Sequence, residues 1–124
     1  MSEFVTGAEE LKAKLKALGP ELARVQGGRA LYQEAKILEA ISHDRTPFDD
    51  GPLRASYETS EPIEESDGNV SVTISVGGPS APYAVYVHEI LWHHHPIGEA
   101  KFLEKTINEA MPTLSGRLAA RITL

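Results

Sequence analysis

The 124-residue chain contains no cysteine. This absence excludes a disulfide framework, a thiolate metal site and a cysteine nucleophile, and it is compatible with folding in a reducing cytosol. The chain also lacks a signal-peptide pattern and any apolar run near the ~20 residues that a membrane-spanning helix needs. We therefore expect a soluble protein that is neither exported by a signal peptide nor inserted in a membrane. Its length predicts a single domain, residues 1–124, with a core of its own.

Positive charge is scarce, because 12 lysines and arginines stand against 18 acids and give a formal net charge of -6. This balance argues against a surface that neutralises phosphates, which needs clustered cations. The segment from Lys101 onward is mildly basic. In an assembly it could contact the acidic run of a neighbouring copy, which lies between Glu58 and Asp67. A charge run is, however, more typical of a solvated loop. The acidic run holds five acids and no base: Glu58, Glu61, Glu64, Glu65 and Asp67.

The N-terminal third has helical periodicity. Capping-box spacing at Thr6–Glu9 predicts a helix start, and apolar residues then recur at three and four residues as far as Leu22. Gly19–Pro20 predicts a kink or a short break in this helix. Gly27–Gly28 marks a second weak point. After it another apolar stripe predicts a second helix that ends near His43; its residues are Leu31, Ala35, Leu38 and Ile41. A histidine at that position is expected to cap the helix.

The remaining two thirds alternate between strand and helix patterns. After a turn at Thr46–Pro52, strict alternation predicts strands at Leu53–Ser60 and Val70–Val76, joined by the acidic connection as an antiparallel hairpin. A helical pattern begins at Glu99, and its Pro112 is expected to bend or interrupt it, as is Gly116. The sequence thus predicts an α+β fold in which N-terminal helices and a C-terminal helix pack on a small antiparallel sheet with a long β-hairpin.

Histidines are concentrated in residues 88–95, which suggests a zinc site. A helical metalloprotease motif needs two histidines four residues apart, but the residue four after His88 is Trp92, so that motif fails. In an extended segment His93 and His95 would share a face, and a site completed by another chain is conceivable. An exposed contact loop is the favoured interpretation. The metal-site candidates are His88, Glu89, His93 and His95.

The other patterns favour binding over catalysis. No glycine-flanked serine elbow occurs, and no Gly-Lys-Ser/Thr follows the glycines at Gly77–Ser80. We therefore expect no catalytic residue and no cofactor. Tyr83, Tyr86 and Trp92 are typical of contact anchors, although they are equally suited to filling the seam between the sheet and the last helix. The expected interaction residues are Glu61, Glu64, Glu65, Asp67, Tyr83, Tyr86, Trp92, His93, His94 and His95.

Four segments in this order resemble the tail-component or neck family, the head-tail joining proteins of HK97-like long-tailed bacteriophages. The resemblance covers about residues 30–111. The matching segments are Thr46–Ser56 (TPFDDGPLRAS), Val70–Gly77, Tyr83–Glu89 (YAVYVHE) and Ala100–Glu104 (AKFLE). Residues 90–95 depart from the family pattern, which commonly has an aromatic residue and a glycine after the glutamate. Ala100 stands where the family often has proline.

The resemblance implies an α+β subunit with a long N-terminal helix, assembled as a homo-oligomeric ring of six or twelve copies. Such a ring would lie in the virion neck or upper tail, after assembly in the host cytoplasm. Its neighbours would be connector or stopper proteins on one side and tail terminator or tail tube proteins on the other. Genomic DNA would pass through its lumen without sequence-specific binding. The alternatives are a small histidine-rich metal-binding module or metal-dependent hydrolase, and a regulatory protein that binds one partner through residues 83–92.

Overall fold

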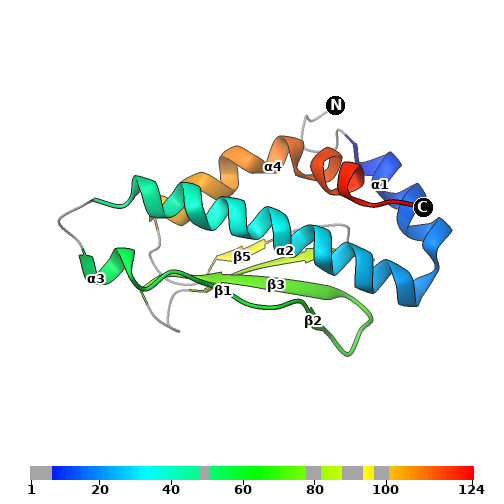
Figure 1. Cartoon of the computed structure of the whole chain (residues 1–124), viewed down its shortest axis with the longest axis horizontal. Coiled ribbons are helices and arrows are strands. Elements are labelled where there is room, and N and C mark those ends of the chain that lie inside the picture. The colour runs from blue at the N-terminus through cyan, green and yellow to red at the C-terminus, as the bar shows by residue number, and fades with distance from the viewer. Residues whose placement is uncertain (1–6, 48–50, 78–81, 88–93, 97–100) are drawn as a thin grey trace.

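The computed structural model of the protein describes residues 7–47, 51–77, 82–87, 94–96 and 101–124, with the backbone alone at Pro82, His95 and Pro96. Within these ranges the fold is α+β, as predicted (Figure 1). The helices are α1 (Ala8–Leu18), α2 (Pro20–Arg45), α3 (Gly51–Arg54) and α4 (Lys101–Arg121). The strands are β1 (Glu58–Thr59), β2 (Ile63–Glu64), β3 (Val70–Ser75), β4 (Pro82–Val87) and β5 (His94–Pro96).

The strands form one antiparallel sheet in the order β1-β3-β4-β5, and β2 pairs with the same edge of β3 as β1 does. β3 is the central strand and pairs with β4 over its whole length, from Val70 opposite Val87 to Ser75 opposite Pro82. The predicted hairpin is therefore present, with β1 and β2 as one arm and β3 as the other. Its acidic connection is partly strand, because Ile63 pairs with Ser71.

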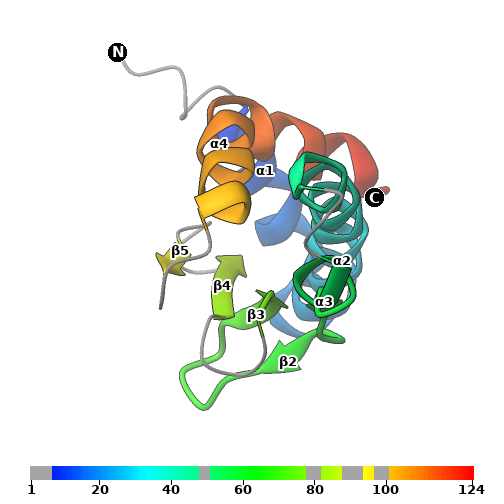
Figure 2. The ribbon, with the colours of Figure 1, turned by 90° about the vertical axis from the view of Figure 1, so that its left-hand side faces the viewer.

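The core lies between the sheet and the helices. Val70, Val72 and Ile74 alternate along β3 and are buried, so this face of the sheet points at α2. α4 packs along α2 and α1, on the side of α2 away from the hairpin (Figure 2). Two layers of structure thus enclose one apolar core, which is the simplest way for an amphipathic sheet and amphipathic helices to bury their apolar faces.

α2 runs without a break through Gly27 and Gly28, so the predicted weak point there is wrong. Both glycines are buried, and they let the helix approach the sheet closely. A Cβ added to Gly28 would lie 3.0 Å from both Pro62 Cβ and Val70 Cγ1. The pair therefore serves close packing, which outweighs the low helix propensity of glycine.

The predicted break at Gly19–Pro20 is present, because α1 ends at Leu18 and α2 begins at Pro20. Gly19 has a φ of 82°, which a residue with a side chain rarely adopts. The start of α1 differs from the prediction. Gly7 occupies the N-cap position, with a φ of 85° and no side-chain cap, and Thr6 lies outside the described residues.

The prediction of a strand over Leu53–Ser60 is wrong for its first half. Residues Gly51–Arg54 form the single turn α3, and the regular pairing of this arm starts at Glu58. Ala55 N–H donates to the Gly51 carbonyl, closing a helical turn that alternation of apolar and polar residues does not reveal. The conformation of such short segments depends on their tertiary contacts.

Pro112 and Gly116 were expected to bend or interrupt this helix; α4 continues from Lys101 to Arg121, so they do not interrupt it. Leu103 and Ile107 are buried before the proline, and Leu114 and Leu118 are buried after it. Packing along α1 and α2 thus holds one helix on both sides of the missing amide donor. Among the described residues, no helix combines the length and apolarity needed to cross a bilayer.

Candidate interaction surfaces

The first candidate surface is the side of the hairpin that faces away from the helices. Because Val70, Val72 and Ile74 point at the helices, Ser71 and Ser75 point to the opposite side, and so do the residues paired with them. Those partners are Ile63, opposite Ser71, and Glu58, opposite Ser75. Glu65 is on the same side, since its carboxylate accepts a hydrogen bond of 2.8 Å from the Ser71 hydroxyl. We call Glu58, Ile63 and Glu65 the hairpin face; all three are exposed, and Ile63 has 50% of its surface exposed.

The other side of the hairpin is fastened to α2. Glu64 lies opposite Val70 and accepts a hydrogen bond of 3.2 Å from Arg24 Nε. Pro62 packs against Gly28. The predicted contact residue Glu64 thus has an intramolecular partner, and this ion pair helps to hold the hairpin face outward.

The acidic run ends in a compact turn. Glu65 N–H donates to the Asn69 carbonyl over 2.8 Å, and Asp67 Oδ1 accepts the Asn69 N–H over 3.0 Å. Gly68 has a φ of 90°, which this turn requires. Asp67 is exposed, as is the predicted contact residue Glu61. The exposed carboxylates of this segment therefore belong to an ordered turn.

The second candidate surface is the outer side of α2, which sequence reasoning missed. Leu22 and Ile41 belong to the predicted apolar stripes, but both side chains are exposed. For Leu22 the reason is that α1 ends before Gly19, so that Leu22 belongs to a different helix from the rest of its stripe. Between these two residues α2 exposes no acid, because Glu34 is buried and Glu39 is partly buried. We call this surface the α2 outer face: Leu22, Val25, Arg29, Lys36, Ile37 and Ile41. Its four aliphatic residues have 41–53% of their surface exposed.

A buried carboxylate joins α2 to α4 beside this face. Glu34 is 3% exposed and accepts hydrogen bonds of 2.7 Å from both Arg117 Nε and Arg121 Nε. Arg121 also donates to Gln33 Oε1 over 3.0 Å. Since two guanidinium groups share one carboxylate, one positive charge is left over at the partly exposed edge of the cluster.

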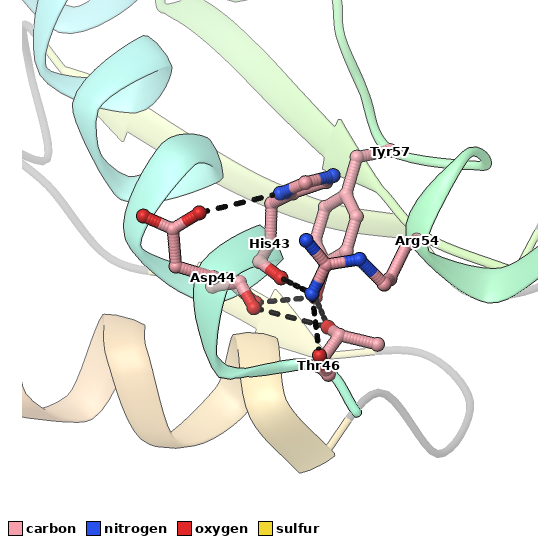
Figure 3. Close-up of polar contacts among 6 residues, drawn as sticks. His43, Asp44, Thr46, Arg54 and Tyr57 are labelled. Atoms are coloured by element: carbon pink, nitrogen blue, oxygen red, sulfur yellow. Dashed lines mark hydrogen bonds and ion pairs between the residues drawn. The ribbon is translucent and has the colours of Figure 1, made fainter. Parts of the chain in front are cut away.

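A polar cluster at the end of α2 contains Ser42, His43 and Asp44, the residue types of a hydrolase site, but in a different arrangement; Figure 3 shows the histidine and the aspartate. The His43 imidazole contacts its neighbour Asp44, with Nδ1 and Oδ1 3.4 Å apart, whereas the Ser42 hydroxyl bonds Tyr57 Oη at 2.6 Å. Among the described residues, the Ser42 hydroxyl thus has no histidine base, which nucleophilic catalysis would require. The cluster instead joins α2 to the segment that leads into β1.

Arg54 completes this junction, and sequence reasoning did not single it out. Its Nη1 donates to the His43 carbonyl over 3.2 Å and to the Thr46 carbonyl over 2.7 Å (Figure 3). Arg54 thus takes the capping role that was expected of His43, because carbonyls at a helix C-terminus need donors. A cation just after a turn rich in proline is the only sequence signal for it.

Tyr83 lies in the core and is fully buried, so it fills the seam rather than anchoring a contact. It stacks on His94 with ring centroids 6.2 Å apart. Burial, followed by the nearby negative charge of Glu104, raises the pKa of Tyr83 to about 12. The hydroxyl makes no well-formed hydrogen bond within the described part of the chain, although it interacts weakly with Glu104. Tyr86 lies opposite Ser71, on the hairpin-face side of the sheet, and is partly exposed.

The predicted metal candidates fall mostly outside the described residues. His88, Glu89 and His93 lie there, as does the contact candidate Trp92, and the side chain of His95 is not described. Among the residues that the structure does describe, no group of three or more metal-binding side chains converges. A metal site has no support from these residues.

Comparisons with protein-family models, with curated proteins and with solved structures found no match to this chain.

Proposed function

We propose that the protein is a structural, non-enzymatic subunit of a tailed-phage virion, in the neck or upper tail. Copies form a ring at the head-tail junction, which joins the capsid connector to the tail and lets DNA pass. The proposal rests on the resemblance of four sequence segments to the head-tail joining family and on the geometry described above.

The order of elements supports the proposal. The resemblance implies a long N-terminal helix and a C-terminal helix on a small antiparallel sheet, and the chain has this architecture. The four segments also coincide with distinct parts of the fold. They include the junction from α2 to β1, the strands β3 and β4, and the start of α4. A fold alone does not specify function, so the proposal also depends on the two exposed surfaces.

The observation that carries the proposal is a pair of exposed surfaces on a fold with a well-packed core. The α2 outer face and the hairpin face together expose five large aliphatic side chains. Exposed aliphatic residues mark a surface that binds other proteins where they form a contiguous patch with a polar rim. The net charge of -6 further suits a ring around DNA, because acidic walls repel a phosphate backbone.

Electron cryomicroscopy of particles from the phage or prophage that encodes the chain tests this function. We expect a ring of copies between the connector and the tail tube. Particles from a null mutant should contain DNA-filled heads that fail to join tails, or aberrant tails. Complete, infectious particles that lack the protein would contradict the proposal, as would a chain that is never found in particles.

A further inference from the structure

We infer that the hairpin face of one copy binds the α2 outer face of the next copy. This inference rests on the proposed function, because it identifies the contact that would build the ring. The occupant of the α2 outer face is thus a second copy of the same chain, and the contact joins two different surfaces.

Charge complementarity is the first argument. Glu58 and Glu65 of the hairpin face have no ion-pair partner among the described residues. Arg29 on the α2 outer face likewise has no ion-pair partner in the described part of the chain, whereas Lys36 shares its charge with Glu39 at 3.3 Å. With the extra arginine charge beside Glu34, the outer side of α2 is positive in a protein that is negative overall. Opposite fields of this kind orient the partners and favour one register.

Apolar complementarity is the second argument. Ile63 is exposed in the middle of the hairpin face, between Glu58 and Glu65. The α2 outer face has the reverse arrangement, with aliphatic side chains at both of its ends and Arg29 and Lys36 between them. Both faces thus combine exposed aliphatic side chains with charges, as protein interfaces combine apolar and polar area.

The dimensions of the two surfaces also agree. From Leu22 to Ile41 the helix rises ~29 Å, at 1.5 Å per residue. The hairpin arm from Glu58 to Glu65 extends up to ~23 Å, at 3.3 Å per residue. The hairpin arm can therefore lie along most of the helix face.

The contact joins two different surfaces of the chain. Within one copy they border each other, because Glu58 of the hairpin face and Lys36 of the α2 outer face line the same hollow. A contact between two different surfaces repeats from copy to copy and closes into a ring when the rotation permits.

Charge reversal in mixed populations tests the contact. Variant one carries Glu58→Lys with Glu65→Lys, and variant two carries Arg29→Glu with Lys36→Glu. Each alone opposes like charges, so its dissociation constant for self-association, measured by analytical ultracentrifugation, should rise at least about tenfold. An equimolar mixture should recover the assembly, because every hairpin face then meets an α2 outer face of opposite charge in an alternating ring.

Matched controls reverse exposed charges elsewhere. Lys12→Glu with Lys16→Glu on α1 controls for variant two, and Glu9→Lys controls for variant one. Both controls should assemble like the wild type. Failure of the mixture to recover assembly would overturn the inference, and so would a wild-type chain that stays monomeric at every concentration. A product that stops at two copies would contradict the repeating geometry.

Cysteine pairing gives an independent readout, because the natural chain has no cysteine. Ile63→Cys protein mixed with Ile37→Cys protein should form an intermolecular disulfide on mild oxidation. The same Ile63→Cys protein mixed with Ala13→Cys protein, which carries its thiol on the exposed side of α1, should not. Equal yields from the two mixtures would overturn the contact whether or not the variants change stability.

The two proposals fail in different ways. If particles contain a ring in which the hairpin face touches another protein, this inference is wrong and the proposed function stands. If the mixtures behave as expected but the chain is absent from particles, the contact stands and the proposed function is wrong.

Discussion

At the scale of single residues, two buried polar groups are accommodated in different ways. The buried hydroxyl of Tyr83 makes no well-formed hydrogen bond within the described structure, whereas the buried carboxylate of Glu34 accepts hydrogen bonds from two arginines. Burial penalises the charged form of any group unless a partner compensates for it. The first group should therefore make the fold sensitive to pH, and the second should make it sensitive to mutation.

We expect the protein to lose stability in alkali through Tyr83. Its folded pKa is about 12 against an ordinary value of 10.0, so the folded state binds the proton more tightly than the unfolded state does. This contribution is complete below pH 10 and falls as the pH rises toward 12, by about 2–3 kcal/mol in total. Urea unfolding across this pH range measures the change.

Tyr83→Phe keeps the ring and removes the titrating group. At neutral pH its free energy of unfolding should stay within about 1 kcal/mol of the wild-type value, since the hydroxyl has no well-formed hydrogen bond in the described structure. Its loss of stability in alkali should be smaller than that of the wild type. Two parallel curves would show that Tyr83 is not the responsible group.

We expect Glu34→Gln to lower the free energy of unfolding by about 1–3 kcal/mol, because it removes the charge that Arg117 and Arg121 share. Both arginines keep about a third of their surface in water, which limits the penalty. Glu21→Gln, at an exposed position in the first turn of α2, should change stability by less than about 0.5 kcal/mol. Equal effects would mean that the cluster does not stabilise the helix pair.

At the scale of elements, α2 packs through two buried glycines, of which Gly27 faces α1 and β4 and Gly28 faces the hairpin. A Cβ at Gly27 would meet Leu15 and Val87 at an ordinary 3.4 Å, but a Cβ at Gly28 would meet Pro62 and Val70 at 3.0 Å. Alanine gains about 0.5–1 kcal/mol over glycine inside a helix. Alanine substitutions at the two positions therefore distinguish the effect of helix propensity on stability from the effect of packing.

We expect Gly27→Ala to raise the free energy of unfolding by up to about 1 kcal/mol. Gly28→Ala should be at least about 1 kcal/mol less stable than Gly27→Ala, because overpacking against the hairpin offsets the gain in propensity. Chemical denaturation of both variants measures the difference. If Gly28→Ala is as stable as Gly27→Ala, the contact with Pro62 does not limit the approach of the helix.

Sequence periodicity predicted the elements that bury one regular face. Val70, Val72 and Ile74 alternate without exception, and β3 was predicted nearly residue for residue. The wrong predictions concern segments whose structure depends on contacts with residues distant in the sequence. Gly28 looked like a helix breaker because its neighbours Pro62 and Val70 are far along the chain, and Pro112 looked like one because the packing of α4 cannot be read locally.

The candidate surfaces were predictable only in part. The acids of the hairpin were identified from composition, but which of them point outward depends on the register, which places Glu58 opposite Ser75 and Glu64 opposite Val70. The α2 outer face was hidden in a pattern that made Leu22 and Ile41 look buried. Knowing which side of an apolar helix faces solvent requires the position of its neighbours.

At the scale of the whole molecule, the negative net charge predicts that the protein does not bind DNA. A net charge of -6 leaves few cations to displace counterions from a duplex, so we expect no retention of duplex DNA at physiological salt. A gel-shift titration with random-sequence DNA checks this expectation. Retention that weakens steeply as salt rises would show a cationic binding path and would contradict a lumen that DNA passes freely.

The attachment of α1 to α4 has a consequence for synthesis. Lys14 Nζ donates to the carbonyls of Ala119 and Ile122, and Gly7 lies so close to Gly116 that a Cβ there would come within 2.5 Å of its Cα. The polar partners of Lys14 are thus synthesised more than 100 residues after α1 itself. Until α4 has left the ribosome, α1 lacks the helix that it packs against, and its apolar side stays uncovered there.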